Sequence, residues 1–278
     1  MRSIDIHAHL TPQSFWRATE NGGAWHTLRR EQDARGQEIA LVGGGRQALP
    51  PRARWTPEER LADMDSLGVD VHVVSPYVGF YNYQLDVDVA TATARETNDE
   101  IASMTRAWPK RFAGLGTLPM QDVKAAIAEL ERCVIRLGLK GAEINDHVNG
   151  RTLEEPEFRP FWKAAEQLGA LIFFHQAGET LVTPRTRRYH LPNSIGNLVD
   201  RAVTFATLVS GGVMDTHPDL SRSSSVTAAA TPATASAAWT TDGRCAPRRA
   251  RTSASRQAPI SGASTTTASS TRSPRYGS

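Results

Sequence analysis

The stretch that decides the fold is Ile4-Asp5-Ile6-His7-Ala8-His9, near the start of the chain. Apolar and polar residues alternate in it, and side chains two residues apart on a β-strand point to the same side. The sequence therefore predicts a strand with its two isoleucines on one face and Asp5, His7 and His9 on the other. Two neutral imidazoles that project together can bind one zinc, iron or manganese ion. A strand with two exposed histidines is the alternative, because His-x-His is a short motif.

Segments of strand type alternate with segments of helix type along the first 210 residues. The expected strands are 4–9, 69–74, 112–116, 139–144 and 171–175, and the expected helices are 56–67, 87–108, 123–137, 157–168 and 193–210. Thr56 is the expected N-cap of the first helix, and Pro57 its first residue. Five strand–helix units with short links are typical of a parallel sheet covered by helices. The fold class predicted is therefore α/β.

Polar side chains stand at the carboxyl ends of three of these strands. They are His7 and His9, then Asn145 and His147, then His175. A parallel barrel collects the carboxyl ends of its strands at one mouth, where barrel enzymes carry their chemistry. We therefore expect His175 to face His7 and His9, which gives three convergent nitrogen ligands. Asn145 and His147 are either polar groups around that site or ordinary loop residues, and His72, in the middle of a strand, is expected in the core.

Between the first strand and the first helix lies a long segment, 11–54, that is rich in Gly and Pro. These breakers predict irregular structure, and a loop of this length in a compact domain is usually functional. Its arginines Arg46, Arg52 and Arg54 either bind an anionic substrate or are simply solvated.

The whole chain has 278 residues, enough for one α/β barrel or two small domains. It has no apolar run long enough to span a membrane and no signal pattern at its start. Its two cysteines, Cys133 and Cys245, provide no disulfide framework. These observations predict a cytoplasmic protein without a membrane partner.

Several separated motifs, in order along residues 1–220, resemble the aminocarboxymuconate-semialdehyde decarboxylase branch of the amidohydrolase superfamily. The motifs are Ile4 to His9, Trp55-x-Pro57-Glu58-x-Arg60, Met64-Asp65, Lys110 to Phe112, Gly114 to Gln121, Glu131 to Val134, Phe173 to His175 and Gly211 to Val213. The resemblance implies a (β/α)₈ TIM barrel of the metal-dependent hydrolase type. It also implies non-oxidative decarboxylation or hydrolysis of a small carboxylated substrate, and a possible homodimer.

The same resemblance assigns ligands for a divalent metal to His7, His9 and His175. Zn²⁺ is the expected ion, with Mn²⁺ or Fe²⁺ as alternatives. In the family a later His, in a His-Gly-Gly-Gly motif, assists the metal-bound water, and a later Asp completes the metal site. Neither motif occurs in this chain, so the catalytic acid–base residue is unknown. After His175 the chain reads Gln176-Ala177-Gly178 instead of the Pro-Trp-Asp of the decarboxylase that names the family, so its substrate does not follow. The family's substrate-binding Arg, before the Trp motif, has no clean counterpart either, and Arg46 and Arg52 are the candidates.

Residues 221–278 differ sharply from the rest of the chain. They contain eight Arg, one Asp and no Lys or Glu, a net charge of +7, in a chain whose total is +3. They also contain no Leu, Phe or Met, and such a segment cannot bury enough apolar surface to fold alone. We expect a partial barrel domain over 1–220 and a low-complexity, disordered tail over 221–278.

The genetic code indicates that this tail is out of frame. In a reading frame that begins one nucleotide earlier, a visible Thr corresponds to Tyr, His, Asn or Asp, and a visible Ala to Cys, Arg, Ser or Gly. Residues 227–240, TAAATPATASAAWT, are then compatible at every position with HGGGYACYGIGRMD. This contains the missing family motif. We infer a frameshift near Ser221, so the basic tail does not indicate a nucleic-acid partner.

The resulting hypothesis is a metal-dependent non-oxidative decarboxylase of a small aromatic or semialdehyde acid, impaired in this form. It has about five βα units of an incomplete barrel. The alternatives are a metal-dependent hydrolase of the same superfamily and a non-catalytic remnant.

Overall fold

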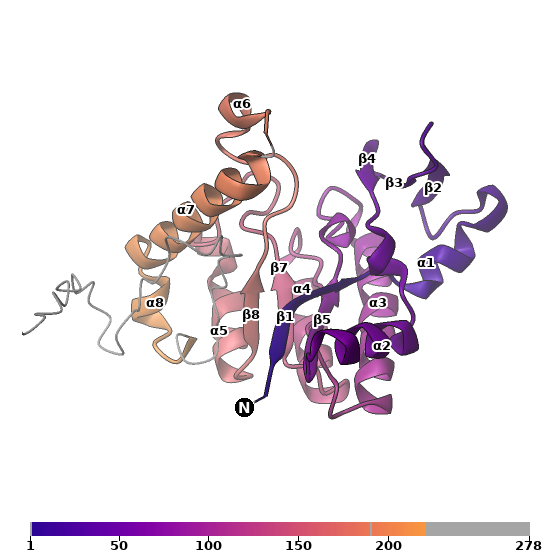
Figure 1. Ribbon diagram of the computed structural model, residues 1–278. Coiled ribbons are helices and arrows are strands. Elements are labelled where there is room, and N and C mark those ends of the chain that lie inside the picture. The colour runs from indigo at the N-terminus through magenta and orange to yellow at the C-terminus, as the bar shows by residue number, and fades with distance from the viewer. Residues whose placement is uncertain (1, 190, 221–278) are drawn as a thin grey trace, which may run out of the picture. The chain divides into compact units, whose positions relative to one another are not determined.

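A computed structural model describes residues 2–189 and 191–220 of the protein (Figure 1). Its parallel strands are β1 (Ile4–Leu10), β5 (Val71–Pro76), β6 (Phe112–Gly114), β7 (Gly141–Ile144) and β8 (Leu171–Phe174). The long helices that follow them in turn are α2 (Pro57–Leu67), α3 (Val87–Ala107), α4 (Val123–Glu131), α5 (Arg159–Gln167) and α7 (Asn197–Ser210). The five expected strand–helix units are therefore confirmed, with boundaries shifted by a few residues.

Short elements complete the described chain. They are α1 (Gln13–Ala18), β2 (Arg29–Gln32), β3 (Glu38–Val42), β4 (Gly45–Ala48), α6 (Thr183–Thr186), α8 (Val213–Thr216), 3₁₀ turns at Glu20–Gly22, Pro51–Arg54, Val78–Phe80 and Pro156–Phe158, and π-helical turns at Arg132–Arg136 and Pro192–Gly196. The π turns extend α4 at its end and α7 at its start, so the expected helices 123–137 and 193–210 are each two joined pieces.

The parallel strands follow one another in space in the order β1-β5-β6-β7-β8. β5 pairs with β1 and β6, and β7 pairs with β8. Gly116 joins the two groups: its N–H donates to the Gly141 carbonyl at 2.9 Å, and its carbonyl accepts from the Glu143 N–H at 2.8 Å. No pairing between described residues connects β8 back to β1, so this part of the chain contains an open sheet and not a closed barrel.

Local sequence signals fix the start and end of α2. The Thr56 hydroxyl accepts a hydrogen bond from the Glu59 N–H, and the Glu59 carboxylate accepts one from the Thr56 N–H. This capping box satisfies two donors that the first turn would otherwise leave unpaired. At the other end Gly68 has φ +69°, a left-handed conformation that glycine adopts without steric cost. The predicted N-cap, Thr56, and the predicted first helical residue, Pro57, are both confirmed.

The expectation of an irregular segment over 11–54 is wrong. The chain forms α1 and then a three-stranded antiparallel sheet in the order β2-β3-β4. Gly36 and Gly43-Gly44 lie in its turns with positive φ, so these glycines are turn residues between short strands and not signs of an irregular segment. Aromatic side chains between this sheet, α1 and α3 hold the unit in place, including Phe15, Trp16, Trp25 and Phe80.

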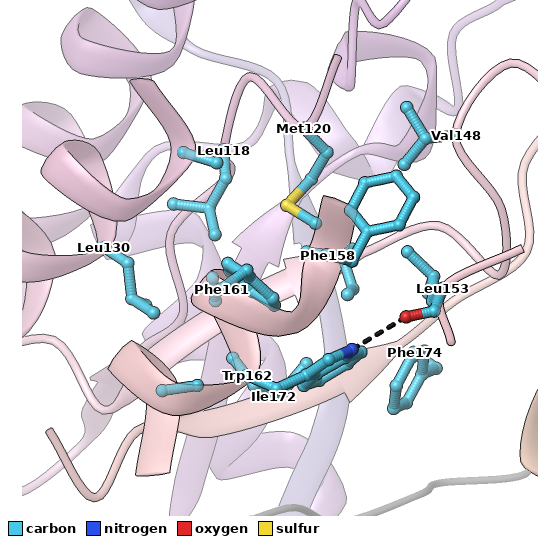
Figure 2. Close-up of a cluster of buried hydrophobic side chains, with 14 of the residues drawn as sticks. Leu118, Met120, Leu130, Val148, Leu153, Phe158, Phe161, Trp162, Ile172 and Phe174 are labelled. Carbon is cyan, nitrogen blue, oxygen red and sulfur yellow. Dashed lines mark hydrogen bonds between the residues drawn. The ribbon is translucent and has the colours of Figure 1, made fainter. Parts of the chain in front are cut away.

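The largest buried cluster packs α4 and α5 against β7 and β8 (Figure 2). Its central members are Leu130, Ile144, Phe158, Phe161, Trp162, Ile172 and Phe174. Burying each side chain of this size contributes roughly 1.5–3 kcal/mol relative to leaving it in water. The Trp162 Nε1–H, which would be costly to bury unpaired, donates to the Leu153 carbonyl at 2.7 Å. This cluster fixes the strand that carries His175.

The outer face of β1 is more exposed than the apolar positions of the other parallel strands. Ile4 is 56% exposed and Ile6 40%, whereas Val74, Ile144 and Ile172 are buried. No helix within the described residues is long and apolar enough to cross a membrane.

The predictions for 221–278, namely the frameshift, the disordered tail and the domain boundary at 220, lie outside the described residues.

Candidate metal centre

Three histidine side chains meet at the carboxyl ends of β1 and β8. His7 and His9 project from the same face of β1, and their Nε2 atoms are 3.0 Å apart. His175 comes directly after β8, and its N–H extends the ladder by donating to the Ile144 carbonyl at 2.9 Å. The His175 Nε2 lies 2.9 Å from the His7 Nε2. The predicted convergence of these three side chains is confirmed.

Backbone carbonyls fix the tautomers of two of these histidines. The Nδ1 of His9 is 3.0 Å from the Pro76 carbonyl, and the Nδ1 of His175 is 2.9 Å from the Gln176 carbonyl. Because a carbonyl oxygen only accepts, both Nδ1 atoms carry the proton when the rings are neutral, and both Nε2 atoms present lone pairs. A proton on the Nε2 of His7 can be donated to only one of these two Nε2 atoms. The cluster therefore fits a cation, and the Nδ1–H groups of His9 and His175 each have an acceptor, as in metal-bound histidines.

Burial keeps the imidazole rings of His9 and His175 neutral. It lowers the pKa of His9 to about 3, with the positive charge of His7 acting in the same direction. It lowers the pKa of His175 to about 4, partly opposed by the negative charge of Glu143. Neutral imidazole is the form that binds metal, so at pH 7 neither ring needs to lose a proton first.

Glu143 is a buried acidic residue beside the cluster and was missed in the sequence analysis. It lies on β7, its side chain is fully buried, and its Oε1 is 3.8 Å from the His9 Nδ1. The Tyr81 hydroxyl donates to Oε1 at 2.7 Å. Burial raises the pKa of this carboxyl, while His175 and the Tyr81 and Ser75 hydroxyls oppose the shift. The available signal was a glutamate within the otherwise apolar strand Gly141–Ile144.

The two polar residues expected near this mouth have different surroundings. The Asn145 side chain is buried, and its Oδ1 accepts from the Ala177 N–H at 2.9 Å, so it ties the loop after β7 to the loop after β8. The Nδ1 of His147 accepts from the Gly150 N–H at 3.2 Å within a turn. Asn145 thus supports the backbone beside His175, whereas His147 is a loop residue. His72 is buried in the core, as predicted.

Arg60 binds the backbone at the carboxyl end of β1. Its guanidinium is buried and donates to the His9 carbonyl at 2.6 Å, and further to the carbonyls of Arg52, Ala53 and Trp55 at 3.3–3.4 Å. Burial lowers its pKa to about 10, so it stays charged at neutral pH. A side chain of α2 thereby fixes the backbone next to a histidine of the cluster.

The candidate substrate-binding arginines lie on the segment between β1 and α2. Arg46, on β4, forms an ion pair with Glu31 and is more than half exposed. Arg52 is 3.5 Å from Asp63, and its guanidinium lies over the Trp55 ring. The third arginine of this segment, Arg54, lies over the Trp16 ring. None of these contacts includes a histidine of the cluster.

A buried ion pair lies beside the loops that follow β7 and β8. The Arg201 Nε, on α7, donates to the Asp146 Oδ1 at 2.8 Å, and its Nη1 donates to the Phe174 carbonyl. Burial raises the pKa of Asp146, and the Arg201 charge opposes that shift. The pair fastens α7 to the ends of both strands, and sequence reasoning did not anticipate it.

Comparison with known proteins agrees with this geometry. Residues 4–221 match the family model described as amidohydrolase. A 2-amino-3-carboxymuconate-6-semialdehyde decarboxylase of Dictyostelium discoideum is 31% identical over 219 residues, which cover 78% of this chain and 60% of that protein. The chain therefore spans about 60% of that relative's length.

Solved structures of two decarboxylases also resemble this chain. The 5-carboxyvanillate decarboxylase of Sphingomonas paucimobilis is 27% identical with a TM-score of 0.62, over 78% of this chain and 65% of that one. The Novosphingobium aromaticivorans enzyme, complexed with manganese and 4-hydroxy-3-methoxy-5-nitrobenzoic acid, is 29% identical with a TM-score of 0.54, over 60% and 47%. The five strand–helix units, the histidine cluster and these matches together show that the chain belongs to the amidohydrolase family.

Proposed function

We propose that this protein is a metal-dependent decarboxylase that removes carbon dioxide, without oxidation, from a small aromatic or semialdehyde carboxylic acid. The observation that carries the proposal is the convergence of three histidine Nε2 atoms at the carboxyl ends of β1 and β8. Support comes from the relatives, since the two proteins of known structure and the Dictyostelium protein are named as decarboxylases of such acids.

The metal ligands proposed are His7, His9 and His175. Their Nε2 atoms converge, and the hydrogen-bonded Nδ1 atoms of His9 and His175 fix these two rings in the metal-binding tautomer. Zn²⁺ suits three neutral imidazoles, and Mn²⁺ and Fe²⁺ are the alternatives, since manganese is present in a related enzyme. When bound, such an ion would supply positive charge that polarises substrate oxygens.

Residues around the cluster define where a substrate would lie. The Tyr77 ring is 6.0 Å from the His9 ring, and the Gln47 side-chain amide donates to the Tyr77 hydroxyl at 3.0 Å. The β3–β4 hairpin is thereby held beside the end of β5. Arg46 precedes Gln47 on β4, so its side chain projects from the other face of the strand, where it pairs with Glu31. Arg46 and Arg52 remain the proposed candidates for binding the substrate carboxylate by charge-assisted hydrogen bonds.

The five units are proposed to be part of a (β/α)₈ barrel. The remaining strands, the acid–base His and the completing Asp would come from the frame restored after codon 221. General acid–base assistance typically contributes about 10²–10⁴ in rate, so the 278-residue chain should be nearly inactive. It should also be poorly soluble because unpaired strand edges invite aggregation. A cytoplasmic location and a homodimer of the repaired protein are part of the same proposal.

The test compares two proteins after loading with Zn²⁺ or Mn²⁺. One is the 278-residue chain, and the other carries the restored frame to its natural stop codon. Each is incubated with a panel of carboxylated aromatic and semialdehyde acids, and carbon dioxide release is followed. Turnover by the repaired protein that exceeds turnover by the 278-residue chain at least 100-fold supports the proposal. Equal turnover would show that the tail is native, and no turnover by either protein would exclude decarboxylation of these acids.

A further inference from the structure

We infer that Glu143 is the anionic component of the metal centre, and that its carboxylate strengthens the binding of a divalent cation by the three histidines. The inference rests on the proposed metal site and adds to it a residue on a third strand. Its basis is the position of this carboxylate and its incomplete set of partners.

The carboxylate lies beside the cluster, on the Nδ1 side of the His9 ring. β7 places Glu143 between the strands that carry the histidines, and its Oε1 is 3.8 Å from the Nδ1 of His9. The peptide N–H of Glu143 is fixed to the Gly116 carbonyl at 2.8 Å, so its backbone cannot move away without breaking the sheet. The carboxylate is therefore held next to a histidine of the cluster.

The bonding of Glu143 is incomplete for a buried carboxylate. Oε1 accepts from the Tyr81 hydroxyl, but that hydroxyl also lies 3.2 Å from the His175 carbonyl and has one proton to share between two acceptors. Oε2 is buried without a hydrogen bond of standard length from the described residues, although the Ser75 hydroxyl is near enough to favour the ionised form. A buried charge that lacks partners is expensive, so a residue kept here needs a compensating group.

A divalent cation would compensate a negative charge on Glu143, and the carboxylate would offset part of the positive charge of the ion. Three neutral imidazoles bring no negative charge of their own. Within 4.0 Å, the described residues offer Glu143 no ion-pair partner other than the His9 imidazole. Asp5, another acidic group near these rings, is 42% exposed, so solvent screens its charge. Among the described residues, Glu143 thus offers a buried carboxyl next to the site.

The alternative is that Glu143 serves only as an acceptor for Tyr81. The two roles predict different results for two conservative variants. Glu143→Gln keeps the shape and an acceptor for Tyr81 but removes the charge. Tyr81→Phe removes the hydrogen bond but keeps the charge.

The experiment measures the dissociation constants of the metal-free 278-residue chain for Zn²⁺ and Mn²⁺, by calorimetry in competition with a chelator. Glu143→Gln should weaken binding at least tenfold, and Tyr81→Phe by no more than threefold. Glu129→Gln is the matched control, because Glu129 is also a buried glutamate but lies on α4 with Arg132 as its partner. Its affinity should equal that of the wild type.

Equal affinities of Glu143→Gln and the wild type, or equal losses in Glu143→Gln and Tyr81→Phe, would overturn the inference. If Glu143→Gln does not fold, Glu143→Asp decides, because it retains the charge but withdraws it from Tyr81. Affinity within tenfold of the wild type supports the charge role, and a larger loss refutes it. Failure of the wild type to bind either ion would instead refute the proposed metal site, so the two failures are distinguishable.

Discussion

The Nε2 of His7 lies 2.9 Å from the Nε2 of His175, although 168 residues separate them and their strands stand at opposite ends of the order β1-β5-β6-β7-β8. A flat sheet of five strands would hold its outer strands about 19 Å apart, at 4.7–4.9 Å per neighbouring pair. The sheet must therefore curve strongly, and Figure 1 shows β1 and β8 next to each other. This curvature brings the three histidines to one place.

Loss of one imidazole should abolish tight metal binding. His175→Gln removes a proposed nitrogen ligand whose backbone position is fixed by Ile144, so we expect at least a 100-fold weaker affinity for Zn²⁺ with the fold retained. The measurement is calorimetry combined with elemental analysis of the purified protein. His217→Gln is the control, because His217 bonds to Glu166 away from the cluster. Comparable metal content in both variants would show that His175 is not a ligand.

The metal-free protein should lose stability in acid through His175. Its folded pKa is about 4 and its ordinary value 6.5, so between these values the unfolded chain binds more protons than the folded chain. The free energy of unfolding therefore decreases as the pH falls through this window. His175→Gln lacks this contribution, so the wild type should lose at most about 1.4 kcal/mol per pH unit relative to the variant. Urea unfolding in chelator from pH 7 to 4.5 measures this, and a pH-independent difference would contradict it.

Removal of the Arg60 guanidinium should destabilise the fold and disturb the site. Arg60→Met leaves the His9 carbonyl and its neighbours without their buried donor, at a cost of about 1–3 kcal/mol in the free energy of unfolding. The metal affinity should fall as well, because the end of β1 is no longer held. Arg29→Met, at an exposed position, should be neutral. Unfolding by urea and metal titration test both parts, and an unchanged metal affinity would confine Arg60 to a role in stability.

The capping box of α2 should be measurable as a local contribution to stability. Thr56→Ala removes the acceptor for the Glu59 N–H and should lower the free energy of unfolding by about 1 kcal/mol. Thr56→Ser keeps a hydroxyl in place and should recover most of this loss. Equal stability of the alanine and serine variants in urea would show that the hydroxyl is not the group that matters.

Features that depend on neighbours along the chain could be predicted from the sequence. The alternation in Ile4 to His9 fixed a strand with both histidines on one side, and Thr56, Pro57 and Gly68 fixed the ends of α2. The five strand–helix units followed from apolar periodicity. These succeed because strand and helix periods and caps are local properties of the backbone. The position of His175 could be anticipated only by assuming a barrel.

Tertiary structure alone decided the fold of residues 11–54 and the surroundings of Glu143 and Arg60. The glycines of 11–54 were compatible with loop or turn, and only the packing of Phe15, Trp25 and Phe80 selects short paired strands there. Glu143 looks like an ordinary strand residue until the curved sheet buries it beside His9, and Arg60 looks like a surface helix residue until its guanidinium meets the His9 carbonyl. Burial and long-range contacts depend on which segments meet in space, and that depends on the curvature of the whole sheet, which no short stretch of sequence encodes.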